Sequence, residues 1–328
     1  MWPPIALRAE DASYTRADTT GSQGPLASYA CVPLRRLLMA LAVITDSTCD
    51  LSAQQLADLH VRRVPLYVHF EGETLKDWIE ITPADLVRRI QEGATPPTTS
   101  QPTPEDFAVA YREAAEAGAD EIVVITLSSN LSGTYQSATL AAKDAPVPVA
   151  VVDSEQASFG AAMMVRRAAA MRDAGKSATE VVEALEAIRK RFLLSFTVGT
   201  LEFLQKGGRI GRASALVGGL LNIKPILTLE DGVVAPAGRA RGVKKAIKEM
   251  VGKLAAFRDA HPDGELVLSF IHIEDEAAAD RIRSAIREEG IDFKDLGTGE
   301  LGAVIGVHVG PGTHGFYALS DPHPEHGM

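Results

Sequence analysis

The stretch LSSNLSGTY, residues 127–135, decides the fold of this chain. It follows the apolar run IVVI at 122–125 and precedes a helical pattern that begins near Tyr135. A buried strand that leads through a polar turn into a helix creates a pocket at the strand's carboxyl end, where open α/β sheets bind ligands. The turn offers backbone N–H groups and four hydroxyls that suit a phosphate or a carboxylate: Ser128, Ser129, Ser132 and Thr134. The alternative is an ordinary turn that caps the helix.

The first half of the chain alternates strand and helix patterns around this turn. Continuous apolar runs predict strands buried on both faces, and helical patterns follow them. We predict strands at 41–45, 61–70, 121–127 and 147–153, and helices from Ser52 and at 82–90, 104–111, 134–143, 157–174 and 179–191. The segment GATPPTTSQPT at 93–103 is too rich in proline and threonine for either regular element. The alternation predicts a parallel-sheet, Rossmann-like α/β domain over 39–190.

The second half follows a different pattern. Asp231-Gly232 lies between two β-like runs, which predicts an antiparallel hairpin. We predict strands at 194–199, 223–229, 233–239, 266–272, 304–309 and 315–319, and helices at 201–205, 214–221, 242–261 and 275–288. These elements predict an α+β domain with a mixed sheet over 191–320, followed by a flexible tail at 321–328. Residues 1–38 lack periodicity and a signal-peptide pattern, so we interpret them as a disordered or wrongly annotated extension.

Composition and missing motifs argue against several classes of protein. The chain has 328 residues and a net charge of −10, which argues against nucleic acid or an anionic membrane as a bulk partner. Its two cysteines, Cys31 and Cys49, form no disulfide framework, so we expect a cytoplasmic protein. No apolar run reaches the roughly 20 residues that span a bilayer. The sequence has no CxxC, HExxH or GxSxG motif, and no Walker A or GxGxxG motif follows a predicted strand, so we expect neither a metal nor a nucleotide cofactor.

Polar clusters at the predicted element ends are candidate ligand-binding groups. Besides the turn at 128–134, they lie at 46–50, 98–101, 207–209 and 308–312. Hydroxyls, an imidazole and a guanidinium can together surround one carboxylate. Each cluster also has a simpler explanation. The aspartates can cap a helix, His308 among valines can be a core residue, and the glycine pair can end a helix and leave Arg209 exposed.

Seven motifs occur in an order that resembles one protein family. They are TDSTCDL (45–51), TSQPT (99–103), SSNLSGTY (128–135), SFG (158–160), KGGRIG (206–211), IKPIL (223–227) and HVGPG (308–312). Together they resemble the DegV family, bacterial fatty-acid-binding proteins that serve as the lipid-carrying subunit of fatty acid kinase. The resemblance covers residues 41–320 and implies a two-domain DegV-like fold.

The resemblance implies that one long-chain fatty acid lies in an apolar tunnel, with no other cofactor. A separate ATP-dependent kinase subunit would phosphorylate its carboxylate to an acyl phosphate for phospholipid synthesis. The chain would then be a lipid-binding subunit without turnover of its own, and we expect a monomer. Chain-length preference depends on the shape of the tunnel, which these motifs do not set.

The same resemblance assigns roles to individual residues. The groups at the carboxylate would be Thr99, Ser132 and His308, with Arg209 close by. Arg241 would face the kinase. Candidates for the tunnel lining are Phe159, Met163 and Met164, although ordinary core packing also explains the two methionines.

Two other functions compete with this interpretation. A small-molecule phosphotransferase or an esterase would use Ser132 and His308 and would turn over substrate without a partner. A catalytic serine and histidine also need an acidic residue to orient the imidazole, and the sequence indicates none. In a regulatory or structural oligomer, the polar turns would merely cap helices.

Overall fold

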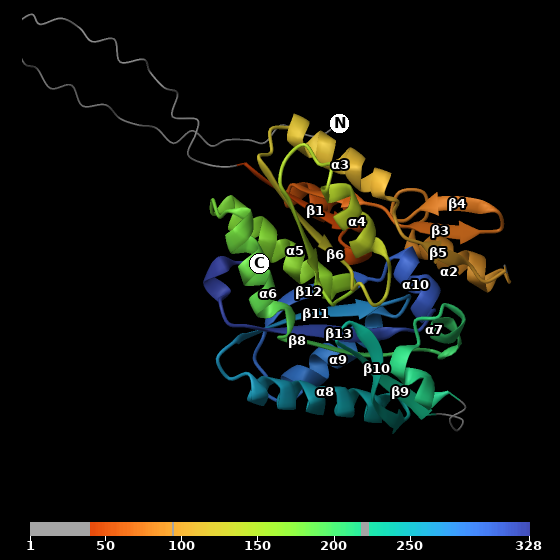
Figure 1. The fold of residues 1–328 in the computed structure, drawn as a ribbon. Coiled ribbons are helices and arrows are strands. Elements are labelled where there is room, and N and C mark those ends of the chain that lie inside the picture. Colours follow the sequence, from red (N-terminus) through yellow and green to blue (C-terminus); the bar gives the residue numbers. More distant parts are fainter. Residues whose placement is uncertain (1–39, 94, 218–222) are drawn as a thin grey trace, which may run out of the picture.

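The computed structural model describes residues 40–93, 95–217 and 223–328, which form two large sheets separated and flanked by helices (Figure 1). The predicted extension at 1–38 and residues 218–221 of the helix predicted at 214–221 lie outside the described residues. Within the described ranges, no helix is both long and apolar enough to cross a membrane.

A four-stranded parallel sheet forms the first half of the molecule, in the order β2-β1-β6-β7. Its strands are β1 (Leu41–Asp46), β2 (Val61–Val64), β6 (Glu121–Thr126) and β7 (Val149–Asp153). One face packs against α3 (Pro104–Glu116) and α4 (Thr134–Ala142), and the other against α5 (Ser158–Asp173) and α6 (Ala178–Arg189). Helices on both faces explain why β1 and β6 are continuous apolar runs. The predicted parallel α/β layer is confirmed.

A six-stranded mixed sheet forms the second half, in the order β10-β9-β8-β13-β11-β12. Its strands are β8 (Phe192–Thr197), β9 (Ile223–Glu230), β10 (Val233–Arg241), β11 (Glu265–His272), β12 (Lys294–Glu300) and β13 (His314–Asp321). The pair β11–β12 is parallel and the other pairs are antiparallel. The predicted Asp231-Gly232 hairpin joins β9 to β10, with positive φ at both residues. Helices α8 (Val243–Ala260) and α9 (Glu276–Glu288) cover the outer face, so the predicted α+β arrangement is confirmed.

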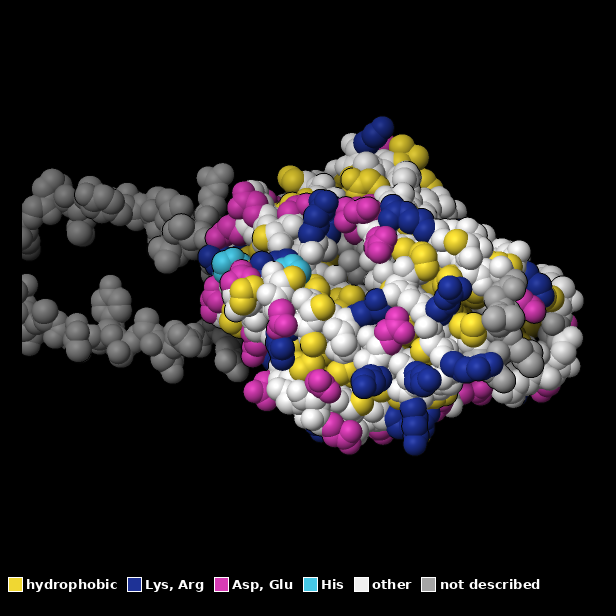
Figure 2. All heavy atoms as spheres, turned by 90° about the horizontal axis from the view of Figure 1, so that it is seen from below, with side chains coloured by type: hydrophobic (Ala, Val, Ile, Leu, Met, Phe, Trp, Pro, Cys, Tyr) yellow, Lys and Arg dark blue, Asp and Glu magenta, His cyan; other side chains and the backbone are white. Residues whose placement is uncertain are grey.

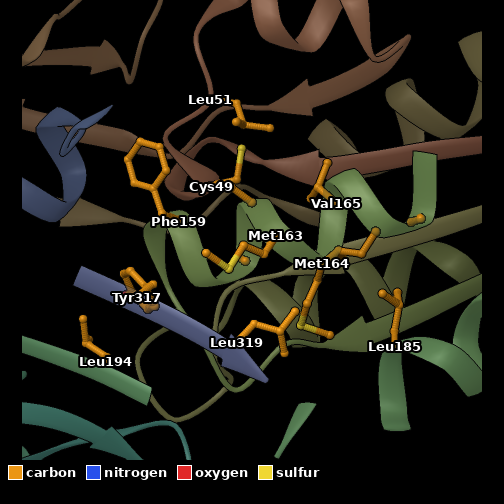
Figure 3. Close-up of a cluster of buried hydrophobic side chains, with 14 of the residues drawn as sticks. Cys49, Leu51, Phe159, Met163, Met164, Val165, Leu185, Leu194, Tyr317 and Leu319 are labelled. Atoms are coloured by element: carbon orange, nitrogen blue, oxygen red, sulfur yellow. The ribbon is translucent and has the colours of Figure 1, made fainter. Parts of the chain in front are cut away.

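Helix α5 packs against both large sheets. It contacts β1 and β6 on one side and β13 on the other. A helix in this position has almost no solvent-facing side, which explains why its sequence is rich in Ala and Met all round. Figure 3 shows Met163 and Met164 between Cys49 and Leu319 of β13. The largest core cluster therefore runs through α5 into both sheets, and the division into domains at residue 190 stays a prediction.

A small third sheet contradicts two sequence predictions. Its order is β4-β3-β5, formed by β3 (Tyr67–Phe70), β4 (Glu73–Lys76) and β5 (Thr98–Ser100). The single strand predicted at 61–70 is wrong, because Pro65 has no N–H to continue the ladder and the chain changes sheets there. The prediction of no regular element at 93–103 is also wrong. Pro96 and Pro97 precede the strand and Pro102 follows it, so 98–100 pairs freely along β3.

The strand predicted at 304–309 is a helix, α10 (Ala303–Val309). A short apolar run fits both periodicities, so the sequence pattern does not distinguish them. Gly302, which is extended, begins this helix, and Gly310 ends it at a φ of 74°. The helix packs against α2 (Pro83–Gln91) and α7 (Glu202–Lys206). Strand β12 was not predicted because its sequence, KDLGTGE, has a single large apolar residue.

The remaining elements are short. They are α1 (Ala53–Asp58) and the 3-10 turns η1 (Ser47–Cys49), η2 (Gly211–Leu216) and η3 (Pro324–His326). The segment that we predicted as a flexible tail makes specific contacts with α5. Arg167 Nε donates to the Gly327 carbonyl oxygen at 3.0 Å, and Arg167 also pairs with Asp321.

Candidate functional site: an internal cavity with one polar end

A cavity of about 410 Å³ lies between the carboxyl ends of the parallel strands and the inner face of the mixed sheet. Its walls are mostly aliphatic and come from both halves of the molecule. They include Leu127 after β6, Leu194 and Phe196 on β8, Ile271 on β11 and Val304 on α10. Such a space suits an apolar ligand.

Four of the residues predicted at the site line this one cavity, although they are far apart in the sequence. They are Thr99 on β5, Ser132 in the turn before α4, Arg209 after α7 and His308 on α10. Thr99 Oγ1 and His308 Nε2 are 2.9 Å apart, and Ser132 Oγ lies 2.9 Å from Thr134 Oγ1. The cavity therefore has hydroxyl, imidazole and guanidinium groups on walls that are mostly aliphatic.

His308 is held in its neutral form. Burial lowers the pKa of its imidazole to about 4, and the charge of Arg209 acts in the same direction. Its Nδ1 is buried and has no hydrogen-bond partner among the residues that the structure describes. Among the described residues, the imidazole is therefore hydrogen-bonded only through Nε2, to Thr99.

Arg209 is held in place by backbone carbonyl oxygens. Its Nε donates to Leu131 at 3.0 Å and its Nη1 donates to Gly207 at 2.8 Å. The glycine pair before it allows this close packing. A Cβ at Gly207 would lie 2.2 Å from His308 Nδ1, and Gly208 has a φ of +69°. The guanidinium is half-buried at the cavity, so the alternative of an exposed Arg209 is wrong.

An outer pocket of about 350 Å³ shares Thr99, Arg209 and His308 with the cavity. Its other walls include Pro97, Phe203 and Lys206, which do not line the cavity. These three shared residues therefore face both spaces. A ligand group that they hold in the cavity lies next to the outer pocket.

The aspartates at 46–50 have structural partners. Asp46 accepts hydrogen bonds from the backbone N–H of Thr48 at 2.9 Å and of Leu127 at 2.7 Å. It thus caps η1 and ties the end of β1 to the turn after β6, as the simpler explanation proposed. Asp50 accepts from Trp78 Nε1 at 3.3 Å, and burial raises its pKa.

The other predicted residues lie away from the cavity wall. Phe159, Met163 and Met164 are buried in the core and are not among the residues that line the cavity described here. Arg241 is exposed at the end of β10. Sequence analysis missed Ser158 and Tyr317, which do line the cavity. Ser158 lies in the SFG motif, whereas nothing in the sequence distinguishes Tyr317 from an ordinary core residue.

The geometry of Ser132 and His308 does not support a hydrolase. Each is hydrogen-bonded to a threonine, Ser132 to Thr134 and His308 to Thr99, and no hydrogen bond joins the two within the described part of the chain. No described carboxylate accepts a hydrogen bond from His308, so the imidazole lacks the orienting acid that such a pair requires.

The fold and the cavity define a class of protein: a layered α/β protein whose mostly aliphatic cavity carries hydrogen-bonding groups and one positively charged side chain, Arg209. A model of the DegV family, which is described as a family of uncharacterised proteins, matches residues 40–321. The chain belongs to the DegV family.

Relatives of known sequence and structure agree with this membership. A DegV domain-containing protein of Deinococcus radiodurans is 42% identical over 278 residues, which cover 84% of this chain and 97% of that protein. A fatty acid-binding protein of Thermotoga maritima is 36% identical over 285 residues, 85% of this chain and 97% of that protein. A solved DegV family structure from Thermus thermophilus, described for its fatty acid binding, is 47% identical with a TM-score of 0.82, over 86% and 100% of the two chains.

Proposed function

We propose that this protein binds one long-chain fatty acid in the internal cavity, with its carboxylate among Thr99, Ser132, Arg209 and His308. The observation that carries this proposal is the gathering of these four side chains on one mostly aliphatic cavity. The relatives from Thermotoga maritima and Thermus thermophilus, both described as binding fatty acids, support the same class of ligand.

The physical chemistry favours this division between tail and head. Each buried methylene of an acyl chain contributes about 0.8 kcal/mol, so the tail supplies most of the affinity. A buried carboxylate is unfavourable unless hydrogen bonds and opposite charge compensate for lost water. Hydroxyl donors, a neutral imidazole and the Arg209 guanidinium provide both.

We further propose that a separate ATP-dependent kinase phosphorylates the bound carboxylate, to give an acyl phosphate for phospholipid synthesis. The outer pocket supports this, because a carboxylate held by the three shared residues lies next to it. Arg241 would contact the kinase. It is exposed, as are the nearby basic residues Arg239, Lys244, Lys245 and Lys248. Figure 2 shows several Lys and Arg side chains together on one face of the molecule. In this proposal the chain is a cytoplasmic monomer without turnover of its own.

Native mass spectrometry of the purified protein tests the binding proposal. We expect a mass increment of one fatty acid that is lost on denaturation and is identified by extraction. A protein that carries no lipid and also binds neither added oleate nor palmitate would contradict the proposal. If the isolated chain consumed ATP or cleaved an ester, and Ser132→Ala abolished that activity, the enzyme alternative would replace it.

Two neighbouring threonines on β5 allow a matched test of the contact with the carboxylate. Thr99→Val removes a hydroxyl that lines the cavity and keeps the shape of the side chain, so we expect oleate to bind about tenfold more weakly. Thr98 lies on the same strand, is exposed and does not line the cavity. Thr98→Val is therefore the matched control and should bind oleate like the unmodified protein. Equal affinities in the two variants would remove Thr99 from the site.

A further inference from the structure

The hydroxyl of Tyr317 is a polar group in the cavity wall that the proposed carboxylate site does not use. Tyr317 lies on β13, is 2% exposed, and lines the cavity with Leu194, which is its cross-strand neighbour on β8. Figure 3 shows the two side chains next to each other. Within the described part of the chain, the Tyr317 hydroxyl has no hydrogen-bond partner. Buried hydroxyls normally have one, so this group is available to a ligand.

The surroundings keep this hydroxyl protonated. Burial raises the pKa of Tyr317, and the nearby carboxyl group of Asp50 raises it further. The ring is fixed by the first turn of α5, because a Cβ at Gly160 would lie 2.7 Å from Tyr317 Cε1. Tyr317 therefore presents a hydrogen-bond donor at a fixed place on the cavity wall. An alkyl chain cannot accept that hydrogen bond, whereas an oxygen atom attached to the chain can.

We propose that Tyr317 recognises a hydroxyl group on the acyl chain, so that the cavity accepts hydroxylated long-chain fatty acids. This inference rests on the proposed function, because the carboxylate must be held at the other residues. With the head fixed at Thr99 and His308, and the donor fixed at Tyr317, the chain has a defined register in the cavity. A hydroxyl at one particular carbon then meets the tyrosine, and a hydroxyl elsewhere is buried without a partner.

Binding of stearate and of a series of hydroxystearates, each with its hydroxyl at a different carbon, tests this inference. For the unmodified protein, we expect one isomer to bind about tenfold more tightly than its neighbours in the series. Tyr317→Phe removes a single oxygen atom. It should abolish the preference for that isomer, and stearate should still bind at least as tightly, because the hydroxyl that an alkyl chain leaves unpaired is gone.

A second buried tyrosine provides the matched control. Tyr111 donates from its hydroxyl to the Ala138 carbonyl oxygen at 3.0 Å, between α3 and α4, and does not line the cavity. Tyr111→Phe should lower stability and keep the preference for the one isomer. Loss of the preference in both variants would mean that a general loosening of the fold is responsible and would overturn the inference.

The results distinguish this inference from the proposed function. If stearate binds but the affinities of the hydroxystearates vary smoothly with hydroxyl position, Tyr317 selects no ligand group and the inference is wrong. The inference is also wrong if Tyr317→Phe still prefers one hydroxystearate isomer. It is equally wrong if, in every complex, an ordered water rather than the ligand is hydrogen-bonded to the Tyr317 hydroxyl. If stearate itself fails to bind to the unmodified protein, the proposed function fails.

Discussion

At His308, burial and a neighbouring guanidinium act in the same direction. Both disfavour the imidazolium, so the ring stays neutral well below the usual pKa of histidine. One ring nitrogen is bonded to Thr99, and the other has no partner among the described residues. A carboxylate placed here would favour the imidazolium again, because it brings an opposite charge. We therefore expect that binding of a fatty acid raises the pKa of His308.

The depressed pKa of His308 predicts a loss of stability in mild acid. The folded protein binds this proton only near pH 4, whereas the unfolded chain binds it near pH 6.5. As the pH falls from 6.5 towards 4, protonation therefore favours the unfolded state. Between pH 7 and pH 4.5, we expect the free energy of unfolding of His308→Gln to fall by ~2 kcal/mol less than that of the unmodified protein. Urea unfolding at both pH values measures this difference.

The buried carboxyls are the main confounding groups in that experiment. Burial raises the pKa of Asp77 to about 7, which makes the folded state more stable as the pH falls through 7. This contribution is present in both proteins, so it cancels when their pH profiles are compared. Parallel profiles would show that His308 is not kept neutral by the fold.

At the scale of elements, the glycine turn after α7 controls the position of α10. Gly207 has a helical backbone that alanine adopts easily, but its Cβ would clash with His308. We expect Gly207→Ala to displace the imidazole and to weaken oleate binding about tenfold, because a hydrogen bond to the head group is lost. Isothermal titration measures the affinity.

The adjacent glycine is the control for this prediction. A Cβ at Gly208 has nothing within 4 Å, but its φ of +69° is strained for alanine. Gly208→Ala should cost about 1 kcal/mol of stability and leave the affinity for oleate unchanged. If Gly208→Ala weakened binding as much as Gly207→Ala, the rigidity of the turn rather than the space beside His308 would matter.

The elements also show how much of the fold can be predicted from the sequence. The apolar runs of β1 and β6 could be predicted as strands, because a strand of a parallel sheet is buried on both faces and is apolar along its whole length. The Asp231-Gly232 turn predicts its hairpin because it needs positive φ. Helix α10 could not be predicted as a helix, since its seven residues fit either period. Strand β5 was missed because its residues have little hydrophobic pattern and pair at a sheet edge.

The candidate site was predictable to a different degree. Thr99, Ser132, Arg209 and His308 were marked by motifs at predicted turns, and the structure brings them to one cavity. The residue that carries the further inference, Tyr317, has no such mark. It becomes notable only when the pairing of β13 with β8 places its hydroxyl on the cavity wall.

At the scale of the whole molecule, a buried ion pair joins the end of β13 to helix α5, which packs against both large sheets. The side chain of Arg167 on α5 is 0% exposed and that of Asp321, at the end of β13, is 3% exposed. We expect Asp321→Asn to cost about 3–5 kcal/mol, because it leaves a buried charge without its partner. Chemical denaturation measures this loss. The double variant Arg167→Met, Asp321→Leu should recover most of it, and a double variant as unstable as the single one would contradict this reason.

The cavity predicts that a ligand stabilises both halves of the molecule together. Its wall includes residues of both large sheets, and the largest core cluster continues across them. At a free oleate concentration of one hundred times Kd, we expect the free energy of unfolding to rise by about 2.7 kcal/mol and the protein to unfold in one transition. Methyl oleate, which has no carboxylate, should give a smaller gain. Two thermal transitions, of which oleate shifts one, would contradict a shared core.

Three residues face both the cavity and the outer pocket, so release of a ligand and access to its head group can be controlled separately. The dwell time of a ligand is governed by how slowly its whole length leaves the interior, whereas the reactivity of its head is governed by what reaches Thr99, Arg209 and His308 from outside. Because these three residues line both spaces, the proposed function lets the head be reached from the outer pocket while the tail remains in the cavity. Under the proposed function, a partner enzyme would convert the head of a water-insoluble ligand while its tail stays in the cavity, without release of the free molecule.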